Sequence, residues 1–175
     1  MPPPAIQTLR DIRTNVEQYV DAIVPTISPL TLSSGNTLNP NETFTFTVDV
    51  GNGAAALGVR LINVRLRLEV GGAVAKLLVP DFAPGQAGTN VTDLNGNPIL
   101  APGGWVNGFI IHFPAGHAWD ALNPGENVPA LQFTGRAQAI GNTNIHARII
   151  ADVDHAWLWP NNQESNSGTR AVSVT

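Results

Sequence analysis

The chain contains no cysteine. A disulfide framework, a zinc–thiolate site, an iron–sulfur cluster and a cysteine nucleophile are therefore all excluded. Its 175 residues are enough to bury a sizeable core without a covalent or metal cross-link. The length also fits a single domain.

Charge is scarce. Only 13% of residues are charged, about half of the roughly 25% that is usual in soluble domains. Nine basic and thirteen acidic residues give a net charge of −4, and Lys76 is the only lysine. Nucleic acid is excluded as the main partner, because phosphate binding needs clustered positive charge. The hydrophobic fraction of 43% argues equally against a disordered chain.

Long apolar runs are missing as well, since none approaches the ~18–20 residues of a membrane span. The first residues, MPPPAIQTLRDIRTN, lack a basic n-region, a continuous apolar segment and a small-residue cleavage site. If Met1 is the natural start, this argues against Sec export and for an assembly built in the cytoplasm. If Met1 was added to a cloned fragment, secretion and a cell-surface location stay open.

Residues 1–25 differ from the rest and predict an N-terminal arm ahead of a single domain over residues 26–175. Three prolines make a stiff start, and a helix is expected over about residues 5–23, ending at Pro25. Arg13 falls on its apolar stripe and weakens the pattern. The stripe, which we expect to serve assembly, consists of Ile6, Leu9, Val16, Val20 and Ile23.

From Thr26 onwards the hydrophobic pattern changes to a period of two. The clearest example is TFTFTVDV at residues 43–50, which predicts a strand with Phe44 and Phe46 inside and threonines outside. Alternation slips at Ile62–Asn63 and predicts a bulge. The other expected strands are residues 26–33, 59–70, 74–80, 105–113, 128–140, 143–154 and 168–175.

The connections are rich in glycine, proline and asparagine. Gly71–Gly72 predicts a hairpin between residues 59–70 and 74–80. Residues 81–104 read as a long loop, in which DLNGNP could close a small hairpin. About seven to eight antiparallel strands predict an all-β fold, a two-sheet sandwich with a short N-terminal amphipathic helix. A closed barrel is the alternative.

Three segments resemble immunoglobulin-like modules of the CARDB type, found in bacterial and archaeal surface proteins. They are LNPNETFTFTVDVGNG (38–53), LNPGENVPALQFTG (122–135) and HARIIADVDHAWLWPNNQESNSGTRAVSVT (146–175). The resemblance covers roughly residues 30–175, with a gap around 81–120, and Asn166–Ser167 stands where that family usually has Asn–Asn. The N-terminal helix and the long loop are further departures. The resemblance implies a structural or adhesive spacer with no inherited active site.

Metal chemistry has weak support. The four histidines His112, His117, His146 and His155 form no H-x-H or H-E-x-x-H spacing. Asp152, Asp154 and Glu164 could gather oxygens around calcium, but a polar turn between strands explains them as well. Asp93-Leu-Asn-Gly-Asn imitates the opening of a calcium loop, but Pro98 stands where that loop needs glycine. No catalytic residue and no cofactor is therefore expected.

Tryptophans are the other candidates. Trp157 and Trp159 are two residues apart and would share one face of a strand. If exposed, they and Trp105 could stack on sugar rings or anchor a protein. If buried, they fill the core.

Three functions follow in order of support. The first is a non-enzymatic structural subunit of a larger assembly, such as a phage virion (capsid decoration or tail-associated) or a surface filament. Its partners would be copies of itself or another subunit, because low charge leaves much uncharged surface to cover. The second is a carbohydrate- or peptide-binding module that uses the tryptophans, and the third is a metal-dependent enzyme with His and Asp ligands.

Overall fold

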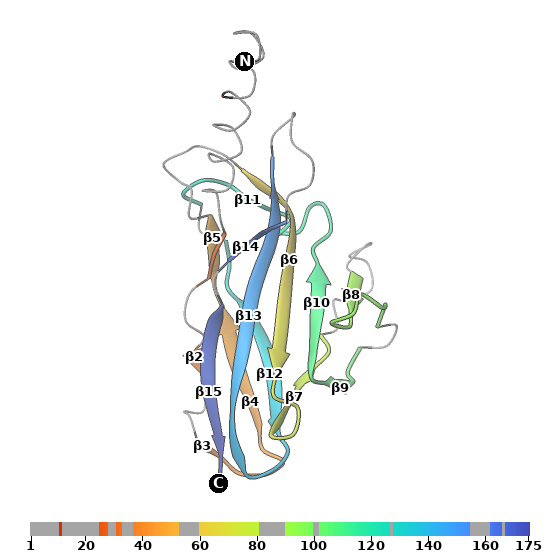
Figure 1. The fold of residues 1–175 in the computed structure, drawn as a ribbon, viewed down its shortest axis with the longest axis vertical. Coiled ribbons are helices and arrows are strands. Elements are labelled where there is room, and N and C mark those ends of the chain that lie inside the picture. Colours follow the sequence, from red (N-terminus) through yellow and green to blue (C-terminus); the bar gives the residue numbers. More distant parts are fainter. Residues whose placement is uncertain are drawn as a thin grey trace, which may run out of the picture.

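The computed structural model describes residues 11, 25–27, 31–32, 37–52, 60–80, 90–99, 102–126, 128–154, 162–165 and 167–175. Within these ranges every regular element is a strand (Figure 1). The strands are β1 (Pro25–Ile27), β2 (Thr31–Leu32), β3 (Thr37–Leu38), β4 (Thr43–Val48), β5 (Val50–Asn52), β6 (Leu61–Val70), β7 (Ala75–Leu78), β8 (Asn90–Thr92), β9 (Trp105–Val106), β10 (Gly108–His112), β11 (Ala121–Leu122), β12 (Leu131–Ala137), β13 (Gly141–Val153), β14 (Gln163–Glu164) and β15 (Gly168–Val174).

Two sheets form the body of the molecule. The eight-stranded sheet runs β3-β15-β13-β6-β10-β8, with β11 beside β6 and β14 beside β13, and the five-stranded sheet runs β2-β4-β12-β7-β9. Figure 1 shows β15, β13, β6 and β10 in one layer and β4, β12 and β7 in the other. Both sheets are open at their edges, so the fold is a sandwich and not a closed barrel.

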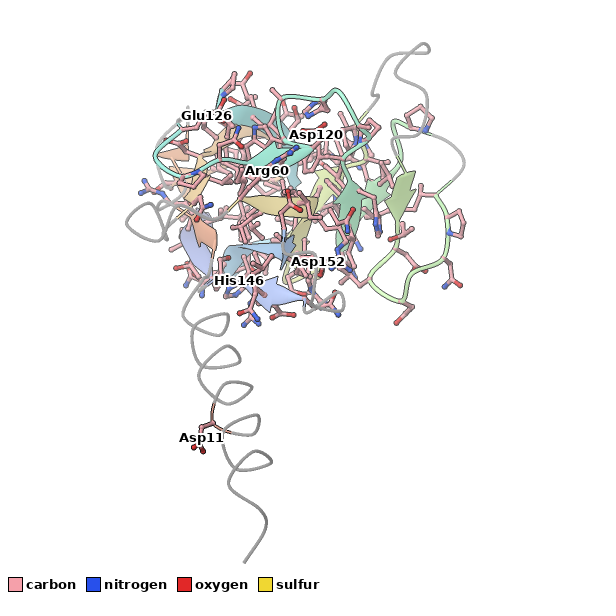
Figure 2. The ribbon with its side chains drawn as sticks, turned by 90° about the horizontal axis from the view of Figure 1, so that it is seen from above. Asp11, Arg60, Asp120, Glu126, His146 and Asp152 are labelled. Carbon is pink, nitrogen blue, oxygen red and sulfur yellow. The ribbon has the colours of Figure 1, made fainter. Side chains whose placement is uncertain are left out.

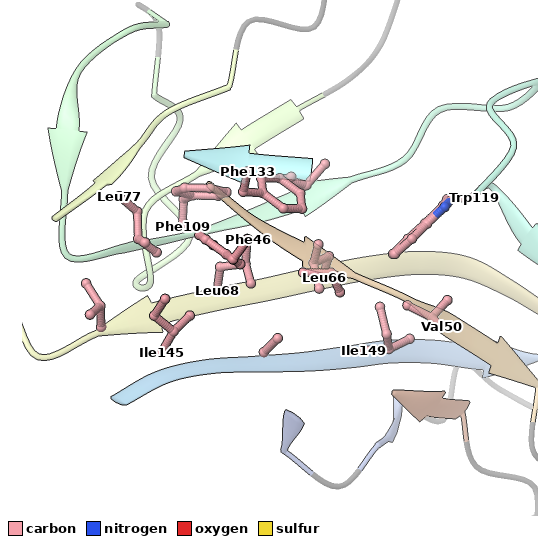
Figure 3. Packing of buried hydrophobic residues seen from close by; sticks show 14 of the residues in the cluster. Phe46, Val50, Leu66, Leu68, Leu77, Phe109, Trp119, Phe133, Ile145 and Ile149 are labelled. Carbon is pink, nitrogen blue, oxygen red and sulfur yellow. The ribbon is translucent and has the colours of Figure 1, made fainter. Parts of the chain in front are cut away.

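The core lies between the layers, as the alternating pattern predicts. Along β4 the apolar residues Phe44, Phe46 and Val48 are buried, and the threonines between them face out. Phe133 of β12 stacks on Phe46 at a ring-centroid distance of 5.8 Å and lies 6.2 Å from the ring of Phe109 on β10. These aromatic rings join the two sheets (Figure 3).

The expected bulge is present in β6. Ile150 pairs with Arg65 and Asp152 pairs with Ile62, so two residues of β6 lie opposite one residue of β13. Asn63 takes up the extra length with a positive φ of 52°. Asparagine tolerates that conformation better than most residues, and the prediction from the slipped alternation is confirmed.

The predicted hairpin through Gly71–Gly72 is wrong. β6 belongs to the eight-stranded sheet, whereas β7 pairs with β12 and β9 in the five-stranded sheet. The chain changes sheet again between β9 and β10 within the predicted strand 105–113. Alternation fixes which side chains face the core, but both sheets offer the same core, so the pattern does not reveal which sheet a strand joins.

Part of the predicted loop 81–104 is ordered as strand. β8 forms the edge of the eight-stranded sheet beside β10. The small hairpin that follows is confirmed, since the Asp93 N–H donates to the Asn97 carbonyl at 2.8 Å and Thr92 bridges to Pro98. Hydrogen bonds lower the pKa of Asp93 below its usual value, and the one from the Asn97 side chain has the largest effect. The Asp93 carboxylate therefore stabilises a turn, as aspartates commonly do.

Gly135 of β12 offers a test of the core packing. It pairs with Phe44 of β4, and an added methyl group would lie 2.6 Å from Cε2 of the Phe44 ring. We expect Gly135→Ala to lower the free energy of unfolding by about 1–3 kcal/mol, because the ring must leave its place. Chemical denaturation would measure the loss.

The double variant Gly135→Ala/Phe44→Leu gives the control. It should recover part of the stability lost in Gly135→Ala, because a smaller side chain makes room for the methyl group. If Gly135→Ala had the same free energy of unfolding as the wild type, this packing would be contradicted.

The predicted N-terminal helix and its apolar stripe lie outside the described residues. Asp11 alone is described there, and it is exposed. Within the described ranges, no helix has the length and apolar character needed to cross a membrane.

Candidate functional site

The structure separates the three carboxylates proposed as weak calcium ligands. Asp152 is buried, and its carboxylate accepts hydrogen bonds from other residues; Asp154 lies 3.8 Å from Arg60, and Glu164 lies 3.5 Å from Arg148. The described residues contain no group of three or more His, Asp or Glu side chains that could hold a metal ion.

The histidines are also spread out. His112 and His146 face outwards from β10 and β13, whereas His117 stacks on Phe113 at 4.9 Å. His146 Nδ1 lies 3.4 Å from the Ser167 hydroxyl. That distance is long for a nucleophile–base pair. His155 lies outside the described residues.

The two described tryptophans differ in burial and in their contacts. Trp119 is fully buried, and its Nε1–H donates to the Pro129 carbonyl at 2.7 Å. Trp105 is half-buried on β9, and the Arg136 guanidinium lies 4.4 Å above its ring. One face of the Trp105 ring is thus already occupied by a cation–π contact. Trp157 and Trp159 lie outside the described residues, so their role in binding stays a prediction.

The two broad faces of the sandwich differ in charge. The outer face of the five-stranded sheet carries no carboxylate on β4, β7, β9 or β12, and its two cations are Lys76 and Arg136. We call this surface the threonine face; its outward side chains are Thr43, Thr45, Thr47, Lys76, Leu78, Trp105, Gln132, Thr134 and Arg136.

The opposite face, outside the eight-stranded sheet, carries paired charges. Arg67 pairs with Glu69 at 2.9 Å, and Arg148 with Glu164 at 3.5 Å. Figure 2 shows His146 and Asp152 on the same side of the sandwich. Most charged residues of the described sheets, and their ion pairs, therefore lie on one face, which composition alone does not reveal.

A cleft opens on this charged face, beside the bulge of β6. Its volume is about 340 Å³, and residues of the β6 bulge, the end of β10, β13 and Asn162 just before β14 line it. It is lined by Asn63, Val64, Arg65, His112, Phe113, Asp152 and Asn162.

Asp152 organises the cleft. Its Oδ2 accepts a hydrogen bond from Asn63 Nδ2 at 3.0 Å, and its Oδ1 accepts one from the Asn162 N–H at 2.9 Å. Asn63 and Asn162 both have positive φ, 52° and 45°. Such backbone conformations persist where surrounding contacts stabilise them, and the shared carboxylate supplies those contacts.

Arg65 and His112 lie side by side in the lining of the cleft. They are direct partners in the β6–β10 ladder and both point away from the core. Burial is the main cause that lowers the pKa of His112, and the Arg65 charge adds to it. Burial also lowers the pKa of His117, against a smaller opposing effect of Asp120. Both imidazoles are therefore mainly neutral at pH 7.

Sequence reasoning found part of this cleft. It marked Asn63 through the slip in alternation, and Asp152 as a weak ligand. It missed Arg65 and its approach to His112, because the pairing of β6 with β10 leaves no local signal.

Comparison with known proteins bears on the fold. No protein-family model and no curated protein matches the sequence. Among solved structures, the chain is similar to a cohesin module from a Clostridium perfringens family 33 glycoside hydrolase, with 7% identity and a TM-score of 0.50, over 85% of this chain and 97% of the module.

Two more solved structures are similar at lower scores. One is the PKD domain of an M14-like peptidase from a Thermoplasmatales archaeon, with 11% identity and a TM-score of 0.35, over 87% of this chain and 97% of that domain. The other is the C-terminal domain of the Streptococcus pyogenes antigen I/II-family protein AspA, with 11% identity and a TM-score of 0.38, over 84% of this chain and 45% of that one. The chain thus shares a two-layer β-sandwich of immunoglobulin-like type with the cohesin module, whereas a CARDB relationship is not among these findings.

Proposed function

We propose that this protein is a non-enzymatic structural and interaction protein whose copies associate in a larger assembly. The observation that supports the proposal is the threonine face, a sheet surface without carboxylates on β4, β7, β9 and β12. A virion, in which the protein decorates a capsid or belongs to a tail, is the assembly we favour. A surface filament is the variant at the cell surface.

A second copy is a suitable partner for this face. Thr45 and Thr134 are direct partners near its middle, and neither carries charge. A twofold axis through this pair would bring threonines against threonines.

The threonine face is smaller than a standard protein–protein interface. The five strands of this sheet are two to seven residues long. At about 3.3 Å per residue and about 4.8 Å between strands they give a projected area of roughly 330 Å². A standard interface buries about 800 Å² per partner. We therefore propose that the apolar stripe of residues 1–25 packs on the neighbouring copy and supplies the remainder.

The cleft supports a binding role more than a catalytic one. Its lining residues are amides, one arginine, one histidine, one buried carboxylate and two apolar side chains. That set contains no hydroxyl, thiol or amine nucleophile, and its one carboxylate accepts hydrogen bonds on both oxygens.

Charge placed on the threonine face tests the proposal. We expect Gln132→Lys/Thr134→Lys to shift the mass measured by light scattering towards that of the 18.5 kDa monomer, because like charges would meet at the interface. Size-exclusion chromatography with light scattering is the measurement. Both side chains face solvent, so the melting temperature should change little.

Two further variants locate the effect. Thr169→Lys/Ala171→Lys adds the same two charges at exposed positions of β15 in the other sheet and should leave the mass unchanged. Val16→Asp/Val20→Asp in the arm should lower it. If the Gln132→Lys/Thr134→Lys variant has the same mass as the wild type, the role of this face is refuted.

A further inference from the structure

The cleft beside the β6 bulge has polar groups that the assembly proposal does not use. It lies on the face opposite the threonine face and has its own network around buried Asp152. Its volume of about 340 Å³ falls at the lower end of the range of about 300–1,000 Å³ for small-molecule sites. We therefore considered which ligand its donors would bind.

Arg65 is the first of these donors. Its Nη2 donates to Asn162 Oδ1, while its Nε is buried and has no hydrogen-bond partner. Within the described part of the chain, Arg65 forms no ion pair. A buried guanidinium N–H without an acceptor is costly, so its present surroundings do not satisfy the hydrogen-bonding capacity of Arg65.

His112 supplies the second donor, opposite Arg65 in the ladder. The neutral imidazole carries one N–H, which can donate to the same ligand. Asp152, the acidic residue of the cleft, already accepts hydrogen bonds on both oxygens. The neighbouring cations Arg67 and Arg148 each have a glutamate partner, so Arg65 is the cation of this area whose charge is not balanced by an ion pair.

The geometry points to a binding site for a small ligand that carries an oxyanion, a carboxylate or a phosphate. We propose that Arg65 binds the oxyanion through its guanidinium group, since a guanidinium matches the planar geometry of such groups. His112 donates the second hydrogen bond. Val64 and Phe113 provide an apolar wall for the organic part of the ligand.

Titrations followed by nuclear magnetic resonance test this site in the full chain. The probes are acetate, inorganic phosphate and glucuronate, each compared with sodium chloride at equal ionic strength. We expect saturable shifts of the Arg65 Nε–H and the His112 ring. A response to acetate and glucuronate alone identifies a carboxylate site, and a response to phosphate alone identifies a phosphate site. A tighter response to glucuronate than to acetate shows that the cleft also binds the organic part.

Variants separate the site from general charge effects. Arg65→Gln should weaken binding at least about tenfold, the loss expected for one charge-assisted hydrogen bond. Arg65→Lys should weaken it less, because the charge remains. Arg148→Gln on the same face should bind as the wild type does. If the wild type shows no saturable shift with any probe, or if Arg65→Gln binds normally, the site is refuted; neither result bears on the mass of the assembly.

Discussion

Replacing Phe46 by alanine is expected to lower the free energy of unfolding by about 3–5 kcal/mol. Phe46 is fully buried in the middle of β4, where its ring is tilted against Phe44 at 6.4 Å and stacks on Phe133 at 5.8 Å. Phe133 in turn lies near Phe109 of the other sheet. Removing the Phe46 ring would leave a cavity at the point where the aromatic side chains connect the layers.

Urea denaturation followed by circular dichroism measures this loss. Gln132→Ala is the matched control, since Gln132 is exposed on the neighbouring strand β12 and its truncation should change stability by less than about 0.5 kcal/mol. Phe46→Leu should fall between the two. If Phe46→Ala cost no more than the control, the sheets would not pack as described.

Trp119→Ala should have an effect of similar size, about 4 kcal/mol. Trp119 is fully buried and lies 5.2 Å from the ring of Phe113, at the opposite end of the core from Leu77 (Figure 3). Truncation would remove the indole and leave the Pro129 carbonyl without its donor. Since a domain is stabilised by only about 5–15 kcal/mol, this variant should be close to unfolding at 37 °C.

Trp119→Phe separates the contribution of ring packing from that of the hydrogen bond to Pro129. It keeps an aromatic ring but removes the N–H that bonds to Pro129, and we expect a loss of about 1–2 kcal/mol. Equal losses in both variants would mean that the hydrogen bond, and not the packing of the ring, stabilises this end of the core.

The sequence predicted the local features of this fold. Threonine and phenylalanine alternate in β4, so its inner and outer faces could be read from a period of two. The bulge at Asn63 was visible because one residue too many interrupts the alternation. These features depend on neighbouring residues alone, and they were correct.

The long-range features could not be predicted in this way. β6 and β7 follow each other through two glycines but lie in different sheets, because alternation does not specify a strand's partner. For the same reason the cleft was only partly visible. Arg65 and His112 belong to strands far apart in sequence, and their meeting depends on the register of β6 with β10.

The few charged residues of the chain are distributed unevenly over the two sheets. The described ion pairs of the two sheets lie outside the eight-stranded sheet, whereas the threonine face has two cations and no carboxylate. A face with so few charges can meet a copy of itself with little repulsion, and that is the basis of the proposed assembly.

The mass of the unmodified full chain over a wide range of concentration tests the central claim most directly. Light scattering should give a multiple of 18.5 kDa at high concentration and a fall towards one copy on dilution, as mass action requires for an association of copies. A mass of one copy at every concentration would contradict the proposal that this protein assembles with itself.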